Sequence, residues 1–526
     1  MTWKLSLPDY NMKRPQLITP GSLNRMLQAA EAAWERKDFQ ECIETLERAS
    51  RLAPSNAGIL LQLGRIHGLR FDYAAAERCF ERALRFAPRK TEMLTAVADR
   101  CQNFRNPETI ERYLRRAVEQ PDSAPETRIK LAELYERLRR LPEAAQLVER
   151  ALKLNPAYPA ALLVRARLER LAGRLETAEQ VLRSFITKPN PDTWTHAQAW
   201  YELGNILDRQ KKFDDAMTAF LEAKTLMRPQ AASHLAELKV FRARLKVMES
   251  NISAEMLQCW FNGSATLIPP RRLALLCGHA RSGTTLLEQV LDAHPDVVSA
   301  EETTTFLDDA FAPLRRNLPP DAYMLPILEA ASTPALLQVR AAYFRSMELS
   351  IGSPIASRLL LDKNPVLTFL IPAFVRIFPE TKFLIALRDP RDVVLSCFMQ
   401  PHQINPITAA YLSLEGTAED YAAIMSIWRT LAPLMPGHYL EVRYEDMVED
   451  LESVARKTLD FLGVTWDARV LGFDEHARKK MVISPTYADV IQPIYKRARS
   501  RWLNYQKYLE PHLAKLEPFV KAFGYE

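Results

Sequence analysis

The sequence is poor in cysteine. Its 526 residues include six, and no two of them form a Cys-x-x-Cys pair. Cysteines scattered in this way favour neither a disulfide framework nor a zinc site. We therefore expect reduced thiols and a cytoplasmic location.

The sequence also lacks long apolar runs. The most apolar segment, Val366 to Phe378, is interrupted by Pro372 and Arg376 and is shorter than the ~20 residues that a bilayer-spanning helix needs. The first residues, MTWKLSLPDYNMKRPQL, contain no apolar stretch long enough for a signal peptide. Neither a membrane span nor secretion by that route is expected.

No charge of one sign dominates. The formal net charge is +6, and so small an excess over this length gives no reason to expect nucleic acid as a partner. With 48% hydrophobic and 25% charged residues, the composition excludes the disordered and fibrous classes. The length predicts about two to four domains, since single hydrophobic cores stop growing near ~250 to 300 residues.

The first half contains a repeat with a period of 34 residues. Small side chains recur at this spacing, and two further columns share the same period. Prolines, which cannot continue a helix, separate the units. The three columns and the prolines are Ala30, Gly64, Ala98, Ala132, Ala166; Cys42, Ala76, Ile110, Ala144, Ala178; Ala49, Ala83, Ala117, Ala151; and Pro54, Pro88, Pro121, Pro156.

This periodicity predicts stacked helix pairs, because helices approach closely only where side chains are short. It resembles a tetratricopeptide-repeat array, in which a sixth unit resumes at Gly204 after a slip in phase. We expect an α superhelix of about six units over residues 23–230, after an N-terminal segment, 1–22. Such arrays bind peptides or mediate assembly, so a protein or peptide partner is expected.

The pattern changes after a predicted helical linker, 231–270. Short apolar runs then alternate with amphipathic helices, which predicts an α/β domain with a mostly parallel sheet over 271–526. Its first strand is expected at Leu273 to Cys277, followed by the loop GHARSGTT and a helix.

This strand, glycine loop and helix are typical of a phosphate cradle. Gly278 and Gly283 allow the backbone to turn so that several N–H groups and the helix N-terminus face one anion. The loop has the GxxxxG frame of a Walker A motif, but Thr284 stands where nucleotide hydrolases have lysine. The loop therefore suits a shorter 5′-phosphorylated group. The plainer alternative is a tight turn between strand and helix.

A second anion site is predicted within Lys382 to Phe398. Its apolar run indicates a buried strand that ends at Arg388, at the edge where open α/β sheets bind ligands. Ser396 lies in the helix that follows, and an arginine with a hydroxyl can bind a phosphate. The alternative is a solvated salt-bridge cluster of Arg388, Asp389 and the charged residues just after them.

Three segments in this order, RSGTTLLEQVLDAHPDVVSAEET, LDKNP and RDPRDVVLS, resemble sulfotransferases that use 3′-phosphoadenosine 5′-phosphosulfate (PAPS). In particular they resemble tyrosylprotein sulfotransferases and their bacterial tetratricopeptide-containing relatives. The resemblance implies an α/β P-loop sulfotransferase domain with a parallel sheet. It also implies transfer of a sulfuryl group from PAPS, as co-substrate and without a metal, to an acceptor hydroxyl, above all that of protein tyrosine.

The resemblance further implies which residues hold the nucleotide. One group matches the family's contacts to the 5′-phosphosulfate, a second its contacts to the 3′-phosphate, and a third matches more loosely. These groups are Arg281, Ser282, Gly283, Thr284 and Thr285; Arg388 and Ser396; and Tyr444, Thr486 and Arg501.

For catalysis, the resemblance implies three residues. Glu302 matches the base that takes the acceptor proton. Lys363 matches the lysine near the bridging oxygen, where positive charge stabilises the leaving nucleotide, and Arg281 would serve the sulfonate. His279, inside the loop, is an alternative base.

The sequence departs from the family on the acceptor side. Thr304, Thr305 and Phe306 follow Glu302 where the animal enzymes carry an arginine for acidic substrate flanks. A carbohydrate, lipid or small-molecule hydroxyl therefore remains an alternative acceptor, and an inactive scaffold a third reading. On the nucleotide side, Gln400 stands four positions after Ser396 where a further basic residue is expected, so one nucleotide contact is expected to be weaker. Whether the chain forms a homodimer also stays open.

Overall fold

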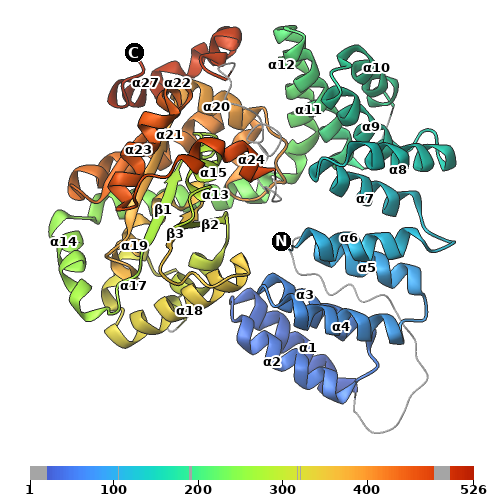
Figure 1. Ribbon diagram of the computed structural model, residues 1–526, viewed down its shortest axis with the longest axis horizontal. Coiled ribbons are helices and arrows are strands. Elements are labelled where there is room, and N and C mark those ends of the chain that lie inside the picture. The colour runs from blue at the N-terminus through green and yellow to red at the C-terminus, as the bar shows by residue number, and fades with distance from the viewer. Residues whose placement is uncertain are drawn as a thin grey trace.

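The computed structural model describes residues 20–102, 104, 106–188, 192–316, 318–319, 321–478 and 498–526. A curved array of helices forms the first part of the chain, and a domain with helices around a sheet forms the rest (Figure 1). This arrangement confirms the predicted fold class.

The array consists of antiparallel helix pairs, as the 34-residue period predicts. Each of the four prolines named above lies between one pair and the next. The pairs are α1 (Pro20–Glu35) with α2 (Phe39–Leu52), α3 (Ala57–Leu69) with α4 (Tyr73–Phe86), α5 (Lys90–Cys101) with α6 (Pro107–Val118), α7 (Pro125–Arg137) with α8 (Leu141–Leu154), α9 (Pro159–Leu171) with α10 (Leu175–Ile186), and α11 (Thr193–Arg209) with α12 (Phe213–Met227).

The column of small residues lies where the two helices of a pair cross. A Cβ atom added to Gly64 would come within 2.5 Å of the Phe80 ring, and one added to Gly204 within 2.6 Å of the Phe220 ring. Both contacts are shorter than van der Waals distance, so each glycine makes room for an aromatic ring of its partner helix. The equivalent alanines of the other units are fully buried.

The second part of the chain contains a parallel sheet of five strands in the order β2-β3-β1-β4-β5. Helices α13 (Ala232–Asn251) and α14 (Ala254–Asn262) precede it. The order reverses direction between β1 and β4, and open sheets bind ligands at the carboxyl ends of strands at such a point. The strands are β1 (Leu273–Gly278), β2 (Val297–Glu301), β3 (Leu359–Lys363), β4 (Lys382–Leu387) and β5 (Tyr439–Arg443).

Helices cover both faces of this sheet, which explains the nearly continuous apolar runs of the central strands β1 and β4. Consecutive residues of β1, such as Leu275 and Leu276, belong to the hydrophobic cores on opposite faces of the sheet. One face packs against α18 (Thr333–Ile351), α19 (Ile371–Ile377) and α21 (Leu414–Leu431), and the other against α15 (Thr284–Asp292), α22 (Tyr444–Glu449), α23 (Leu451–Leu462) and α24 (Phe473–Ala477). The remaining helices include α16 (Ala312–Arg315), α17 (Met324–Ala330), α20 (Pro390–Phe398), α26 (Gln506–Leu509) and α27 (Leu513–Ala522).

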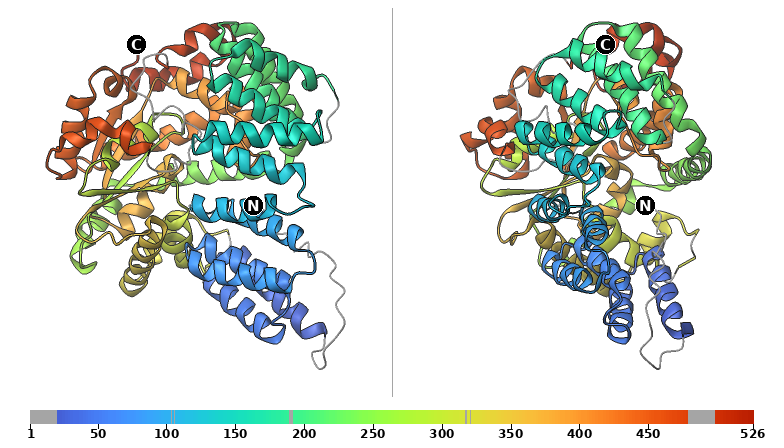
Figure 2. Two further views of the ribbon diagram at one scale, coloured as in Figure 1. Left: turned by 45° about the vertical axis from the view of Figure 1, so that its right-hand side comes forward. Right: turned by 90° about the vertical axis from the view of Figure 1, so that its right-hand side faces the viewer.

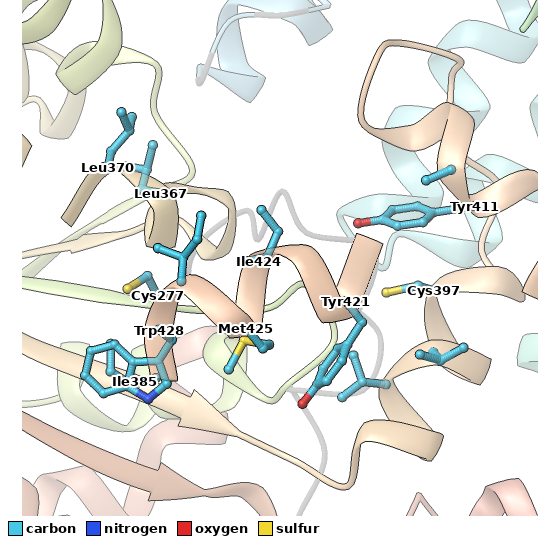
Figure 3. Close-up of a cluster of buried hydrophobic side chains, with 14 of the residues drawn as sticks. Cys277, Leu367, Leu370, Ile385, Cys397, Tyr411, Tyr421, Ile424, Met425 and Trp428 are labelled. Atoms are coloured by element: carbon cyan, nitrogen blue, oxygen red, sulfur yellow. The ribbon is translucent and has the colours of Figure 1, made fainter. Parts of the chain in front are cut away.

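Helix α21 shows how the first face is packed. Figure 3 shows Ile424, Met425 and Trp428 of this helix in one cluster with Cys277 of β1 and Ile385 of β4. All five side chains are at least nine-tenths buried. The cluster fixes the two strands whose carboxyl ends border the predicted anion sites.

The array touches the second domain at both of its ends (Figures 1 and 2). At the last repeat, one continuous hydrophobic core runs from α11 and α12 into α20 and the C-terminal helices. At the first repeats, Arg70 bonds to Asp309. The described residues include no helix that is long and apolar enough to cross a membrane.

Lys224 of α12 is an unusual buried side chain at the first of these contacts. It directly follows the third small column of the repeat, where earlier units carry apolar residues such as Leu84 and Leu152. It is 1% exposed, and its ammonium lies 5.0 Å from the ring of Tyr201 and 4.7 Å from that of Phe398. None of the ion pairs found among the described residues includes Lys224, so the two rings stabilise the charge.

Replacing Lys224 by methionine is expected to stabilise the protein. Burial lowers the pKa of Lys224 from 10.5 to about 7, against a smaller opposite effect of Cys397. Between these two pH values the unfolded chain binds the proton and the folded chain does not, so stability rises with pH across this window. Lys224→Met should add about 1–4 kcal/mol to the free energy of unfolding at pH 6 and less at pH 9. Denaturant titrations at both pH values measure this, and an equal gain at both would contradict it.

Candidate functional site

The loop after β1 has the backbone of an anion cradle. Gly278 and Gly283 adopt φ angles of 137° and 94°, and Gly283 is the N-cap of α15, which begins at Thr284. The hydroxyl of Thr368 donates to the Gly278 carbonyl and accepts from its N–H at 2.9 Å. The loop thus delivers the chain to a helix N-terminus whose N–H groups face the carboxyl edge of the sheet.

The two predicted anion sites form one cluster at this edge. Nε of Arg281 donates to Oγ of Ser396 at 3.0 Å, which joins the loop after β1 to the helix after β4. Nη1 of Arg388 donates to the Arg281 carbonyl at 3.2 Å, and its guanidinium lies 5.0 Å from the centre of the Tyr444 ring. The Tyr444 ring also packs on Gly283, where an added Cβ would come within 2.8 Å.

Beside this cluster, Lys363 is surrounded by three carboxylates. Its Nζ lies 2.8 Å from Glu302, 3.3 Å from Glu288 and 3.4 Å from Glu301. The strand register explains the arrangement, because Lys363 ends β3 directly opposite Glu301 of β2 and Leu276 of β1.

The exposure of the three carboxylates separates their roles. The side chains of Glu288 and Glu301 are 0% and 8% exposed, whereas that of Glu302 is 35% exposed. Burial by itself would lower the pKa of Lys363, but the three glutamates outweigh it and raise this pKa above its usual value. Lys363 is therefore a fixed cation, and Glu302 is the carboxylate that an incoming group can reach.

Glu302 and Arg281 both have strained backbones. Their φ angles are 47° and 71°, in the left-handed region that non-glycine residues rarely adopt. The N–H of Glu302 donates to the Lys363 carbonyl at 2.6 Å, which holds the turn closed. Strain of this kind persists only where the surroundings enforce it, and it is concentrated at functional sites.

The structure argues against His279 as a base. This side chain is 2% exposed, and its Nε2 lies 3.5 Å from Asp420. Burial lowers the pKa of His279, but Asp420 and Cys397 more than compensate and raise it to about 10. His279 is thus a buried imidazolium paired with the carboxylate of Asp420. An imidazolium has no lone pair with which to accept a proton, so His279 does not suit the role of base near neutral pH.

The other predicted nucleotide contacts lie in different surroundings. Ser282, Thr284 and Thr285 lie in the cradle with Arg281 and Gly283, all three nearly buried. Arg501 is directed to the array, where Nη2 pairs with Asp208 of α11 at 2.9 Å. Thr486 lies outside the described residues.

Glu288 is the site residue that the sequence patterns did not single out. It lies in α15 on the buried side of the helix, accepts from the Ser299 hydroxyl at 2.9 Å and pairs with Lys363. A fully buried carboxylate is rare without a partner. A glutamate on the apolar face of α15 was the available signal, but its partner Lys363 lies 75 positions away, at the end of β3.

The geometry defines an α/β domain with a glycine-loop cradle, joined to a helical-repeat array, and comparisons with known proteins agree. Residues 274–468 match the model of the sulfotransferase family. Residues 57–90, 111–159, 129–192 and 195–232 match tetratricopeptide-repeat models. The chain therefore combines tetratricopeptide repeats with a sulfotransferase-family domain, as the motifs predicted.

Three relatives illustrate the similarity. An uncharacterized protein of Aquifex aeolicus is 26% identical over 72% of this chain and 49% of its own length. The protein-tyrosine sulfotransferase of Drosophila melanogaster is 27% identical over 48% of this chain and 52% of its own length. Protein-tyrosine sulfotransferase 2 of Gallus gallus is 27% identical over 48% of this chain and 69% of its own length. The chain spans about half the length of the first two.

The cradle gives a direct test of its backbone. A Cβ atom at Gly278 would lie 2.4 Å from the carbonyl oxygen of Ala386 in β4, which cannot move without breaking the sheet. Gly278→Ala should lower the free energy of unfolding by about 2 kcal/mol or more.

Gly173→Ala is the matched control for this substitution. Gly173 also has a positive φ, 80°, but nothing lies within 4 Å of an added Cβ. It should lose only about 1 kcal/mol, the cost of the left-handed backbone. Equal losses in urea titrations of the two variants would show that the contact with Ala386 does not matter.

Proposed function

We propose that the protein is a sulfotransferase that moves a sulfuryl group from PAPS to the hydroxyl of a protein tyrosine. The observation that carries the proposal is the placement of the Lys363–Glu302 pair beside the cradle of Arg281, on one edge of the sheet. An anion site and a reachable carboxylate held by a buried cation are what this transfer requires.

The cradle fits a nucleotide with two separate phosphates. The loop from Gly278 to Thr285 offers backbone N–H groups and hydroxyls for a 5′-phosphosulfate. Arg388 and Ser396 offer a guanidinium and a hydroxyl for a 3′-phosphate, and Tyr444 supplies an aromatic face against the loop. Residue 284 is threonine in place of the Walker lysine, which fits a donor that needs no grip on β- and γ-phosphates.

The chemistry divides among three side chains. PAPS, when bound, supplies the sulfuryl group and a nucleotide leaving group. Glu302 accepts the proton of the acceptor hydroxyl as that oxygen attacks, since it is the exposed member of the carboxylate cluster. Lys363 holds Glu302 in place at 2.8 Å and contributes positive charge at this edge, and Arg281, on the loop, would neutralise the sulfonate.

Protein tyrosine is supported by the named activity of the insect and chicken relatives. The repeat array adds a second argument, because tetratricopeptide arrays bind peptides. Both arguments favour a polypeptide acceptor over a carbohydrate or a lipid. An acceptor screen with labelled sulfate distinguishes these classes.

Nucleotide binding is the first test. Calorimetry should show that the protein binds adenosine 3′,5′-bisphosphate without metal and in preference to adenosine 5′-diphosphate. Arg388→Ala should weaken binding of the bisphosphate by about 1.5–3 kcal/mol, the value of a charged hydrogen bond. Its effect on nucleotides that lack the 3′-phosphate should be small.

Arg391→Ala is the control for this measurement. Arg391 lies three residues further on, but it pairs with Asp389 and the Tyr525 carbonyl. Preference for ATP with Mg²⁺, or equal losses for nucleotides with and without a 3′-phosphate, would refute the donor assignment.

Glu302→Gln tests the base. The substitution keeps the shape of the side chain and removes its basicity, so turnover should fall by about 10²- to 10⁴-fold while bisphosphate binding is retained. Glu301→Gln, in the adjacent and nearly buried carboxylate, should cost less. Unchanged turnover in Glu302→Gln would remove Glu302 as the base.

A further inference from the structure

The segment that follows Glu302 connects the catalytic edge, which is the carboxyl edge of the sheet with Lys363 and Glu302, to the first two repeats. Its residues Thr303 to Thr305 lead into a π-helical turn, η3 (Phe306–Phe311), of the kind often found at functional sites. Phe306 is fully buried and stacks on Phe374 of α19, with 3.6 Å between the ring centres. The segment is thus anchored in the second domain by its aromatic side and reaches the array with its acidic side.

On the array, Arg70, directly after α3, makes the closest bonds to this segment. Its Nη2 lies 2.7 and 2.6 Å from the two carboxylate oxygens of Asp309 and 3.0 Å from the Ser346 hydroxyl of α18. The side chains of Arg70 and Asp309 are only 16% and 14% exposed. A charged hydrogen bond shielded from water to this degree keeps most of its strength.

Two further ion pairs join the array to the second domain. Lys37, between α1 and α2, lies 3.8 Å from Asp308. The neighbouring Asp38 lies 3.4 Å from Arg316, just after α16. Positive and negative groups on the array therefore each meet a group of opposite sign, which fixes the register of this contact as well as its strength.

The same segment is tied to the candidate base. Asp308 accepts from the Thr304 hydroxyl at 2.6 Å, and its N–H donates to the Thr304 carbonyl. Asn364 donates to the Thr303 carbonyl at 3.0 Å, one residue after Lys363. The segment between Glu302 and Asp309 is therefore bonded to the end of β3 at Thr303 and to the array at Asp308 and Asp309.

We propose that the first two repeats position Glu302, with Arg70 as the positioning residue. The inference rests on the proposed function and extends it, because it makes the array a part of the catalytic apparatus. The strained backbone of Glu302 needs surroundings that enforce it. The Lys363 carbonyl does so from one side, and Arg70, through Asp309 and η3, does so from the other. Loss of Arg70 then lets the carboxylate leave its position without touching the nucleotide cradle.

The first readout is hydrogen exchange followed by mass spectrometry on the full-length chain. In Arg70→Met, amides of the Thr303–Phe311 segment should exchange about tenfold faster or more, since local opening is no longer opposed by the ion pair. Amides of the loop Gly278–Thr285 should be unchanged. This measurement needs no acceptor and no turnover.

The second readout is kinetic. Turnover of Arg70→Met should fall by about 10- to 100-fold, as expected for a displaced catalytic group, with an unchanged affinity for adenosine 3′,5′-bisphosphate. Arg70→Lys should restore part of both effects. The exchanged pair, Arg70→Asp with Asp309→Arg, should recover more than either single variant. Asp214→Asn is the control, because Asp214 pairs with Lys507 at the other end of the array and should leave both readouts unchanged.

The outcomes separate the two proposals. Unchanged exchange of Thr303–Phe311 in both Arg70→Met and Arg70→Asp would overturn the positioning role, whatever the activity. Exchange that rises while kcat stays constant would overturn it too, since the segment would then move without affecting Glu302. A protein that shows the exchange effect but neither binds the bisphosphate nor transfers sulfate would refute the proposed function and leave the contact as purely structural.

Discussion

The buried ammonium of Lys363 is the constraint on which the catalytic edge depends. A lysine with 0% exposure needs compensating charge, and the parallel register supplies it by placing the ends of β2 and β3 side by side, with α15 contributing Glu288 from below. Lys363 thus has three carboxylates around it. Glu302 is the most exposed of the three, so it is the one that contacts solvent and that accepts the acceptor proton in the proposed reaction.

The array is joined to this edge by chemistry of two kinds. At its last repeat the contact has an apolar centre that is continuous with the core, with Lys224 between two rings and the ion pairs Asp208–Arg501 and Asp214–Lys507 in addition. At its first repeats the contact is ionic and local, made by Arg70, Lys37 and Asp38. Apolar burial gives a permanent attachment, whereas ion pairs of matched sign specify one position. The array is therefore anchored at one end and aligned at the other.

Much of this could be predicted from the sequence, for identifiable reasons. Local patterns with a fixed period predicted the helix pairs, and the succession of strand, glycine loop and helix predicted the cradle. The RSGTT and RDPRDVVLS motifs were each expected to bind a different part of the same nucleotide, and the hydrogen bond of Arg281 with Ser396 joins them. Contacts set by tertiary packing were not predictable. Glu288 reads as an ordinary helical residue until Lys363 is placed beside it, and Arg501, matched by position to a nucleotide contact, is directed to Asp208 because the last repeat packs there.

The acceptor-side departure from the family also has a structural context. The arginine expected shortly after Glu302 is absent, and the residues in its place, Thr304 and Phe306, bond within the segment or stack in the core. The positive groups that pair with this segment from the array, Lys37 and Arg70, are engaged with Asp308 and Asp309. If the proposed function holds, recognition of an acidic acceptor would fall to surfaces outside the segment. The array, which is joined to the segment by these ion pairs, is one such surface.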